Sequence, residues 1–189
     1  MTIKIQGLRF DYQQNRPQVP TVRVPKGTGA LFIGSAVDVV SSLAVPAGTS
    51  NSSFIAGSVI ALEDSNGKSC QNLASADGGT VLVAVATNGT RFIINASGTV
   101  VAADLNGAQN ANLTAETATP ASQTSDGNFF SLRRLDMATK AAAGTQRQLI
   151  LLQALPIGLD AEGDALNTGL GTNVDVLVTV NPLNIRTIA

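Results

Sequence analysis

"GGTVLVAVATNGTRFIINASGTVVAADLNG", residues 78–107, is the stretch that says most about the fold. Valines alternate up to Asn88-Gly89, and the apolar residues beyond it keep the same period of two. This alternation is typical of strands with one buried face, and Asn-Gly supplies the two positive φ values that a primed two-residue turn requires. The stretch therefore predicts a hairpin about Asn88-Gly89, with a third strand over 99–104 that completes a meander.

The segments on either side have a similar texture. Residues 54–63 run into Asn66-Gly67, which predicts a second hairpin. Residues 147–157 predict a strand too continuously apolar to face water, and valines alternate over 174–183. Many short strands separated by Gly and Asn turns predict an all-β fold, either an antiparallel sandwich, a jelly roll or a small barrel.

Two segments between these strands look different. Residues 107–128 are small and polar with little periodicity, which predicts a long surface excursion where binding features often lie. Residues 136–144 are the only segment that predicts a short helix, with Asp136 as its N-cap and Gly144 as its stop.

The beginning of the chain has its own composition. Three prolines lie among residues 13–29, where they remove backbone donors and favour an extended conformation, so this segment is predicted to be neither helix nor central strand. Residues 1–26 hold five bases and one acid, a balance of +4, while the remainder holds seven bases and twelve acids, a balance of −5. We therefore expect an extended basic N-terminal arm over 1–29 and a β-rich body over 30–189.

The residues that usually carry chemistry are scarce. The chain has no histidine and one cysteine, Cys70, so it lacks the commonest general base and cannot form an internal disulfide. Asp160, Glu162 and Asp164 alternate, but without the glycine position and final glutamate of a calcium loop. No stretch approaches the roughly 20 apolar residues that cross a bilayer. We expect no enzyme, no catalytic residue, no cofactor, no metal and no membrane partner.

The order of features resembles a known family. The carriers are the stretch 81–107, the small-residue excursion after it, and the closing pair "LILLQALPI" (149–157) and "LGTNVDVLVTVNPLNIR" (170–186). This order is similar to that of the capsid decoration, or cement, proteins of tailed bacteriophages. The resemblance implies a β-rich homotrimer made in the host cytoplasm, which sits on the capsid surface of the virion and bridges neighbouring subunits of the major capsid protein.

Six cations are the candidate contacts with such a partner: Arg9, Arg16, Arg23, Lys26, Arg133 and Arg134. The alternative function is a phage head or tail fibre module that binds a receptor through the excursion at 107–128, although aromatic side chains for sugar recognition are few. A basic arm also suits nucleic acid, but the acidic body and the absence of aromatic platforms argue against that partner.

Overall fold

The computed structural model describes residues 7–10, 19–118, 131–155, 170–172 and 174–188. Within these residues the regular structure is strand, together with two single-turn 3₁₀ helices, Ala102–Asp104 (η1) and Pro182–Asn184 (η2), and no α-helix. The named strands pair antiparallel throughout, which confirms the predicted all-β antiparallel fold. The choice among a sandwich, a jelly roll and a barrel stays a prediction.

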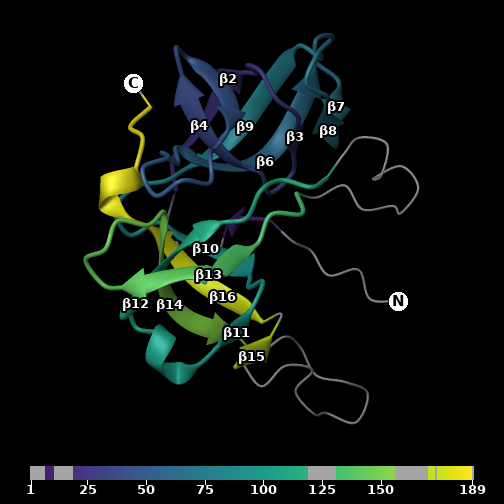
Figure 1. Cartoon of the computed structure of the whole chain (residues 1–189). Coiled ribbons are helices and arrows are strands. Elements are labelled where there is room, and N and C mark those ends of the chain that lie inside the picture. Colours follow the sequence, from purple (N-terminus) through teal and green to yellow (C-terminus); the bar gives the residue numbers. More distant parts are fainter. Residues whose placement is uncertain (1–6, 11–18, 119–130, 156–169, 173, 189) are drawn as a thin grey trace.

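One six-stranded sheet, called sheet A here, forms the lower half of the molecule in Figure 1. Its strands in spatial order are β1 (Arg9–Phe10), β10 (Arg91–Asn95), β16 (Asp175–Val180), β14 (Leu149–Leu155), β12 (Gln109–Leu113) and β13 (Leu135–Ala142). Phe92, Leu149 and Val178 are fully buried in the apolar core on one face of this sheet. The period-two pattern of β10 and β16 therefore reports the side of the sheet that faces this core.

A second sheet, called sheet B, forms the upper half and has its own core around Val59, Val81 and Val83. Its strands in spatial order are β2 (Thr21–Pro25), β9 (Gly79–Val85), β6 (Gly57–Asp64), β4 (Ala36–Val40) and β5 (Leu43–Pro46), and β7 (Ser69–Cys70) pairs with β6. The two edge strands approach each other at one end, where Lys26 forms a bridge with Ala44. Sheet B thus curls back toward itself.

Two short pairs complete the strands. β3 (Leu31–Phe32) pairs with β8 (Asn72–Leu73), and β11 (Thr99–Val100) pairs with β15 (Gly171–Thr172). No helix in the described residues is long and apolar enough to span a membrane.

The predicted hairpin at Asn88-Gly89 is wrong. β9 belongs to sheet B and β10 to sheet A, and β11 pairs with β15, so the expected meander is absent from these residues. The turn closes with a bond from Thr90 N to Thr87 O (3.1 Å), and only Gly89 has a positive φ, of 97°. One positive φ at the third position is the type II pattern, which splays strands rather than pairing them. The turn therefore passes the chain from one sheet to the other.

The predicted helix over 136–144 is also wrong, because β13 occupies most of it. Leu135 and Met137 alternate into the core of sheet A, and β13 pairs with β12 across a register shift. Burial of one face outweighs the helix propensity of the Ala- and Lys-containing segment. By contrast, the predicted strands over 147–157 and 174–183 are confirmed by β14 and β16, and the hairpin about Asn66-Gly67 is confirmed by the pairing of β6 with β7.

The expected arm over 1–29 needs correction where the structure describes it. β1 pairs with β10 at the edge of sheet A, and β2 pairs with β9 at the edge of sheet B. An edge strand tolerates proline when the missing N–H would have pointed away from its neighbour, and this is how Pro25 fits at the end of β2. Residues 1–6 and 11–18 lie outside the described residues.

Amide side chains from sheet A hold the loop between β5 and β6, and so join the two halves. Asn112 Nδ2 donates to Asn51 Oδ1 (2.7 Å), Asn184 Nδ2 donates to Asn51 O (2.7 Å), and Gln148 Nε2 donates to Gly48 O (2.8 Å). Asn184 and Gln148 are fully buried. These hydrogen bonds link the two halves and compensate the hydration that the buried amide N–H groups lose.

Candidate partner interface

Two of the six predicted contact residues, Arg9 and Arg23, are held in ion pairs within the chain. Arg9 Nη2 lies 2.6 Å from Asp175 Oδ2, and Asn95 Nδ2 donates to the other oxygen of that carboxylate at 3.1 Å. Arg23 Nη1 lies 2.5 Å from Glu63 Oε2, and its side chain remains 60% exposed. Arg16 lies outside the described residues.

Lys26 and Arg133 are buried and donate to backbone carbonyls. Lys26 Nζ donates to Gly27 O (3.0 Å) and Ser75 O (3.2 Å), and Arg133 Nη1 donates to Ala47 O (2.6 Å). Burial lowers the pKa of both side chains, because a charge loses its hydration there, although nearby carboxylates oppose the shift. The cationic groups of Lys26 and Arg133 therefore form hydrogen bonds within the fold.

Arg134 is half-buried and donates from Nη2 to Ala96 O at 2.5 Å. The described residues of this set lie in two places: Arg23 and Lys26 on or beside β2 at the edge of sheet B, and Arg9, Arg133 and Arg134 beside each other on sheet A, where Gly7 N donates to Arg133 O (2.9 Å). Their role in partner contact stays a prediction.

The predicted excursion over 107–128 begins as a strand. β12 occupies its first part and lies between β14 and β13 in sheet A, so that part is not a surface loop. After β12, Glu116 ties together two distant stretches of backbone: its Oε1 accepts from Ala118 N (3.0 Å) and Leu132 N (2.9 Å), and its Oε2 accepts from the Ser131 hydroxyl (2.5 Å). Residues 119–130 lie outside the described residues.

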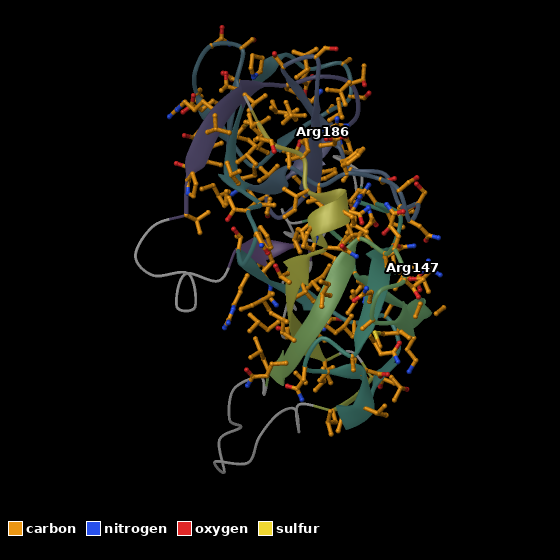
Figure 2. All side chains as sticks on the ribbon, turned by 90° about the vertical axis from the view of Figure 1, so that its left-hand side faces the viewer. Arg147 and Arg186 are labelled. Carbon is orange, nitrogen blue, oxygen red and sulfur yellow. The ribbon has the colours of Figure 1, made fainter. Side chains whose placement is uncertain are left out.

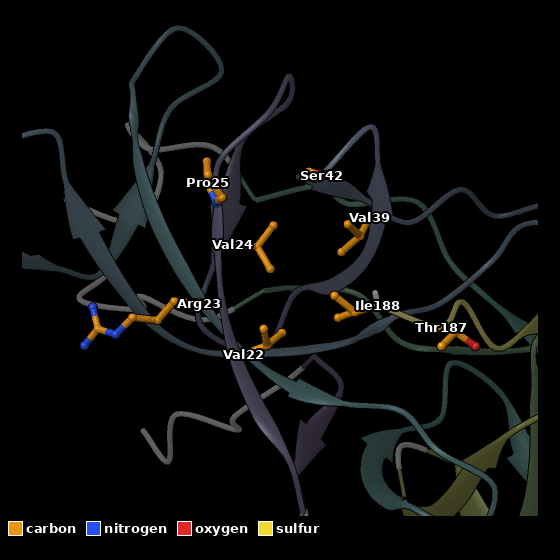
Figure 3. A pocket seen from close by; sticks show the side chains of 8 residues that line it. All are labelled: Val22, Arg23, Val24, Pro25, Val39, Ser42, Thr187 and Ile188. Carbon is orange, nitrogen blue, oxygen red and sulfur yellow. The ribbon is translucent and has the colours of Figure 1, made fainter.

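A groove that sequence reasoning missed runs along β2 (Figure 3). Its first cavity holds about 290 Å³ and is lined by Val22, Val24 and Pro25 on one side and by Val39, Thr187 and Ile188 on the other. A second cavity of about 700 Å³ shares Val22, Thr187 and Ile188 with the first. The only signal for it in the sequence is the pair of valines set between prolines, a pattern that fits an edge strand.

The second cavity lies between the two sheets. It continues from Pro20 and Thr21 over the turn that joins β9 to β10, and its far wall is Pro182 and Ile185 at the end of sheet A. Apolar atoms dominate the surface of the groove, and Arg23 is the one ionisable residue among those that line the two cavities. Because Arg23 is paired with Glu63, the groove is close to neutral.

The C-terminal segment 185–188 forms one wall of the groove. Asn184 O accepts from Ile55 N (2.8 Å), and Arg186 N donates to Ile55 O (3.1 Å). The Arg186 guanidinium binds Asp38 through two hydrogen bonds of 2.8 and 3.0 Å and lies 4.3 Å over the ring of Phe54. These hydrogen bonds raise the pKa of Arg186, so its charge is permanent.

Figure 2 places Arg186 where the C-terminal segment passes from sheet A to sheet B, well away from Arg147 on the lower half of the molecule. Arg147 makes no such link between the sheets: its Nε donates to Thr139 O (2.9 Å) and its Nη1 to Gln146 O (2.8 Å). The segment that follows Arg186 is therefore fastened to sheet B by a side chain as well as by backbone bonds.

The described residues offer no group of three or more His, Cys, Asp or Glu side chains that could hold a metal. Asp160, Glu162 and Asp164 lie outside them. Cys70 is half-buried, and burial together with three nearby carboxylates raises the pKa of its thiol, which keeps the sulfur protonated at neutral pH.

No family model, curated protein or solved structure matches the chain. The described residues offer a neutral apolar groove beside a strand edge, and most of the cations among them are engaged within the fold.

Proposed function

We propose that the chain is a structural protein of a virion, which decorates a bacteriophage capsid and stabilises it by bridging neighbouring subunits of the major capsid protein. Its place would be the capsid surface, after synthesis in the host cytoplasm, and its working form a homotrimer. Closed symmetry of this kind is the general rule for soluble oligomers. The alternative, a receptor-binding fibre module, is separated from it by the experiment below.

The observation that carries the proposal is that the molecule has few charged residues and that its described contact cations are bonded within the fold. Only 13% of its residues are charged. Of the predicted contact cations that the structure describes, Arg9 and Arg23 pair with carboxylates, and Lys26, Arg133 and Arg134 donate to carbonyl oxygens. A surface of small uncharged side chains around an apolar groove suits contact with other protein subunits, whose interface cores are poor in charge.

Deleting residues 1–26 would not test this proposal, because the deletion removes β1 and β2 and would unfold both sheet edges. The full chain should instead be mixed with capsids of the tailed phage whose genome encodes it, and then sedimented. We expect saturable co-sedimentation at a fixed ratio to coat subunits, and a higher melting temperature of the capsid. Absence from the capsid pellet together with saturable adhesion to host cells would contradict decoration and favour the fibre module.

A further inference from the structure

The register of β2 shows which of its backbone groups are unused. Lys26 N donates to Gly79 O (2.9 Å), and Val85 N donates to Pro20 O (2.9 Å). In an antiparallel pair the hydrogen-bonded positions alternate along the strand, so the backbone N–H and C=O groups of Val22 and Val24 also point toward β9. The N–H and C=O groups of Thr21 and Arg23 therefore point away from β9, toward the groove.

No described strand pairs with Thr21 or Arg23 on that side, since β2 ends the strand order of sheet B. Further along, the edge is closed: Pro25 has no N–H, and Lys26 and Gly27 meet β5, with Gly27 N donating to Ala44 O (2.8 Å). The open edge is therefore confined to the part of β2 that borders both cavities.

The side chains beside this edge supply an apolar floor. Val22 and Val24 face Val39 and Ile188 across the groove (Figure 3); Val22 is half-buried, whereas Val24 is 4% exposed and belongs to the core of sheet B. A strand laid along β2 would direct every second side chain onto this floor, while its backbone met Thr21 and Arg23. Two donors and two acceptors at strand spacing match a polypeptide backbone, which carries both kinds of group at that spacing.

From this geometry we infer that β2 binds an extended, uncharged segment of a partner polypeptide by β-strand addition, through the backbone groups of Thr21 and Arg23. Charge selects the occupant: the groove's single cation is neutralised by Glu63, so a charged side chain facing the floor would lose its water without gaining a partner. The inference goes beyond the proposed function and holds wherever the partner segment comes from.

The test uses the full ¹⁵N-labelled chain and the peptide acetyl-Gly-Ser-Thr-Val-Thr-Val-Thr-Gly-Ser-amide as the probe. We expect saturable shifts and slowed hydrogen exchange at the amides of Thr21 and Arg23. A permuted peptide of the same composition, with its valines adjacent, lacks the alternating face and should bind at least several-fold more weakly. Absence of saturation, or changes confined to other amides, would overturn the inference.

Two substitutions at one position separate backbone from side chain. Arg23→Pro removes an N–H that β9 does not use, whereas Arg23→Ala removes the guanidinium and its ion pair but keeps the N–H. Arg23→Pro should weaken peptide binding about tenfold relative to Arg23→Ala. Equal affinities would overturn the inference, and the exchange measurement on the unaltered chain decides the matter if Arg23→Pro fails to fold.

A second copy of this chain is the rival occupant. If it filled the groove, sedimentation would show a mass that grows with concentration, the Thr21 and Arg23 amides would be protected without peptide, and Arg23→Pro alone would abolish both effects. That combination would overturn the assignment to a separate partner segment.

Discussion

Gly57 is the residue whose size the fold restricts most clearly. It lies buried in β6, opposite Val85 of β9. A Cβ at this position would stand 2.1 Å from Ala84 O and 2.7 Å from Val83 Cγ1, distances that no rotamer change can relieve because the first neighbour is backbone.

Gly57→Ala is therefore expected to destabilise the protein by about 3 kcal/mol, through separation of β6 from β9, measured by urea unfolding. Gly67→Ala is the matched control: its φ of 77° is costly for alanine, but nothing lies within 4 Å of the added Cβ. It should lose only about 1 kcal/mol. Gly57 itself has no positive φ, so equal losses for the two variants would mean that the strands move apart at little cost, and would contradict the expected steric effect.

The strands on either side of Asn88-Gly89 could be predicted from the sequence, but their pairing could not. The alternation around Asn88-Gly89 correctly predicts that strands lie on both sides, because the period of two depends only on which face is buried. The pairing of those strands depends on the φ of one residue. Asn-Gly is compatible with both a primed turn and a type II turn, and packing of two separate cores selects the second.

At the scale of elements, β4 and β5 form a hairpin whose turn could not be predicted from its sequence, because it contains neither Asn nor Gly. Its two turn residues, Ser41 and Ser42, have φ values of 50° and 63°. This is the pattern of a primed turn, in which Asn and Gly are the favoured residues and serine is strained.

Replacing Ser41 by Asn and Ser42 by Gly should stabilise the protein by about 1 kcal/mol, visible as a higher urea midpoint with an unchanged slope. Ser52→Gly, another exposed serine in a turn but without a positive φ, should bring no gain. A gain from Ser52→Gly of the same size would mean that the effect is not specific to the left-handed positions.

The C-terminal segment 185–188 depends on Arg186 for its attachment to sheet B. Arg186→Ala removes two hydrogen bonds to Asp38 and the contact with Phe54, and the pair is partly exposed, at 37% and 13% for the two side chains. We expect a loss of about 1 kcal/mol in urea unfolding. Because Thr187 and Ile188 line the groove, the peptide affinity of β2 should also fall.

Arg147→Ala is the control for that experiment, since Arg147 donates only to carbonyls of the β13–β14 region. It should leave peptide affinity unchanged. If Arg186→Ala and Arg147→Ala reduced the affinity equally, the wall formed by residues 185–188 would have no specific part in binding.

The groove also shows why elements can be predicted more readily than sites. Residues 20–25 and 182–188 lie at opposite ends of the chain, and they meet only because η2 passes from sheet A back to sheet B. No local pattern encodes that meeting. Similarly, the helix propensity of 136–144 is real but is overruled by β12, whose pairing with β13 cannot be inferred from either segment alone.

At the scale of the whole molecule, the basic beginning and acidic remainder of the sequence act within the fold as well. Arg9 binds Asp175 near the other end of the chain, and Arg23 on β2 binds Glu63 on β6 across the intervening strand β9 of sheet B. The charge asymmetry, which suggested an arm in search of an acidic partner, is thus partly neutralised inside each copy. Among the described residues, the neutral groove and its open strand edge are available to a partner.

The most direct test of the account combines both proposals in one measurement: hydrogen exchange of the full chain, free and bound to capsids, followed for backbone segment 19–25. We expect saturable binding to the capsid with slowed exchange at the amides of Thr21 and Arg23, because a coat segment would pair with β2. Binding without protection of these amides would contradict strand addition while leaving decoration intact. Protection by the synthetic peptide without any binding to capsids would contradict decoration while leaving strand addition intact.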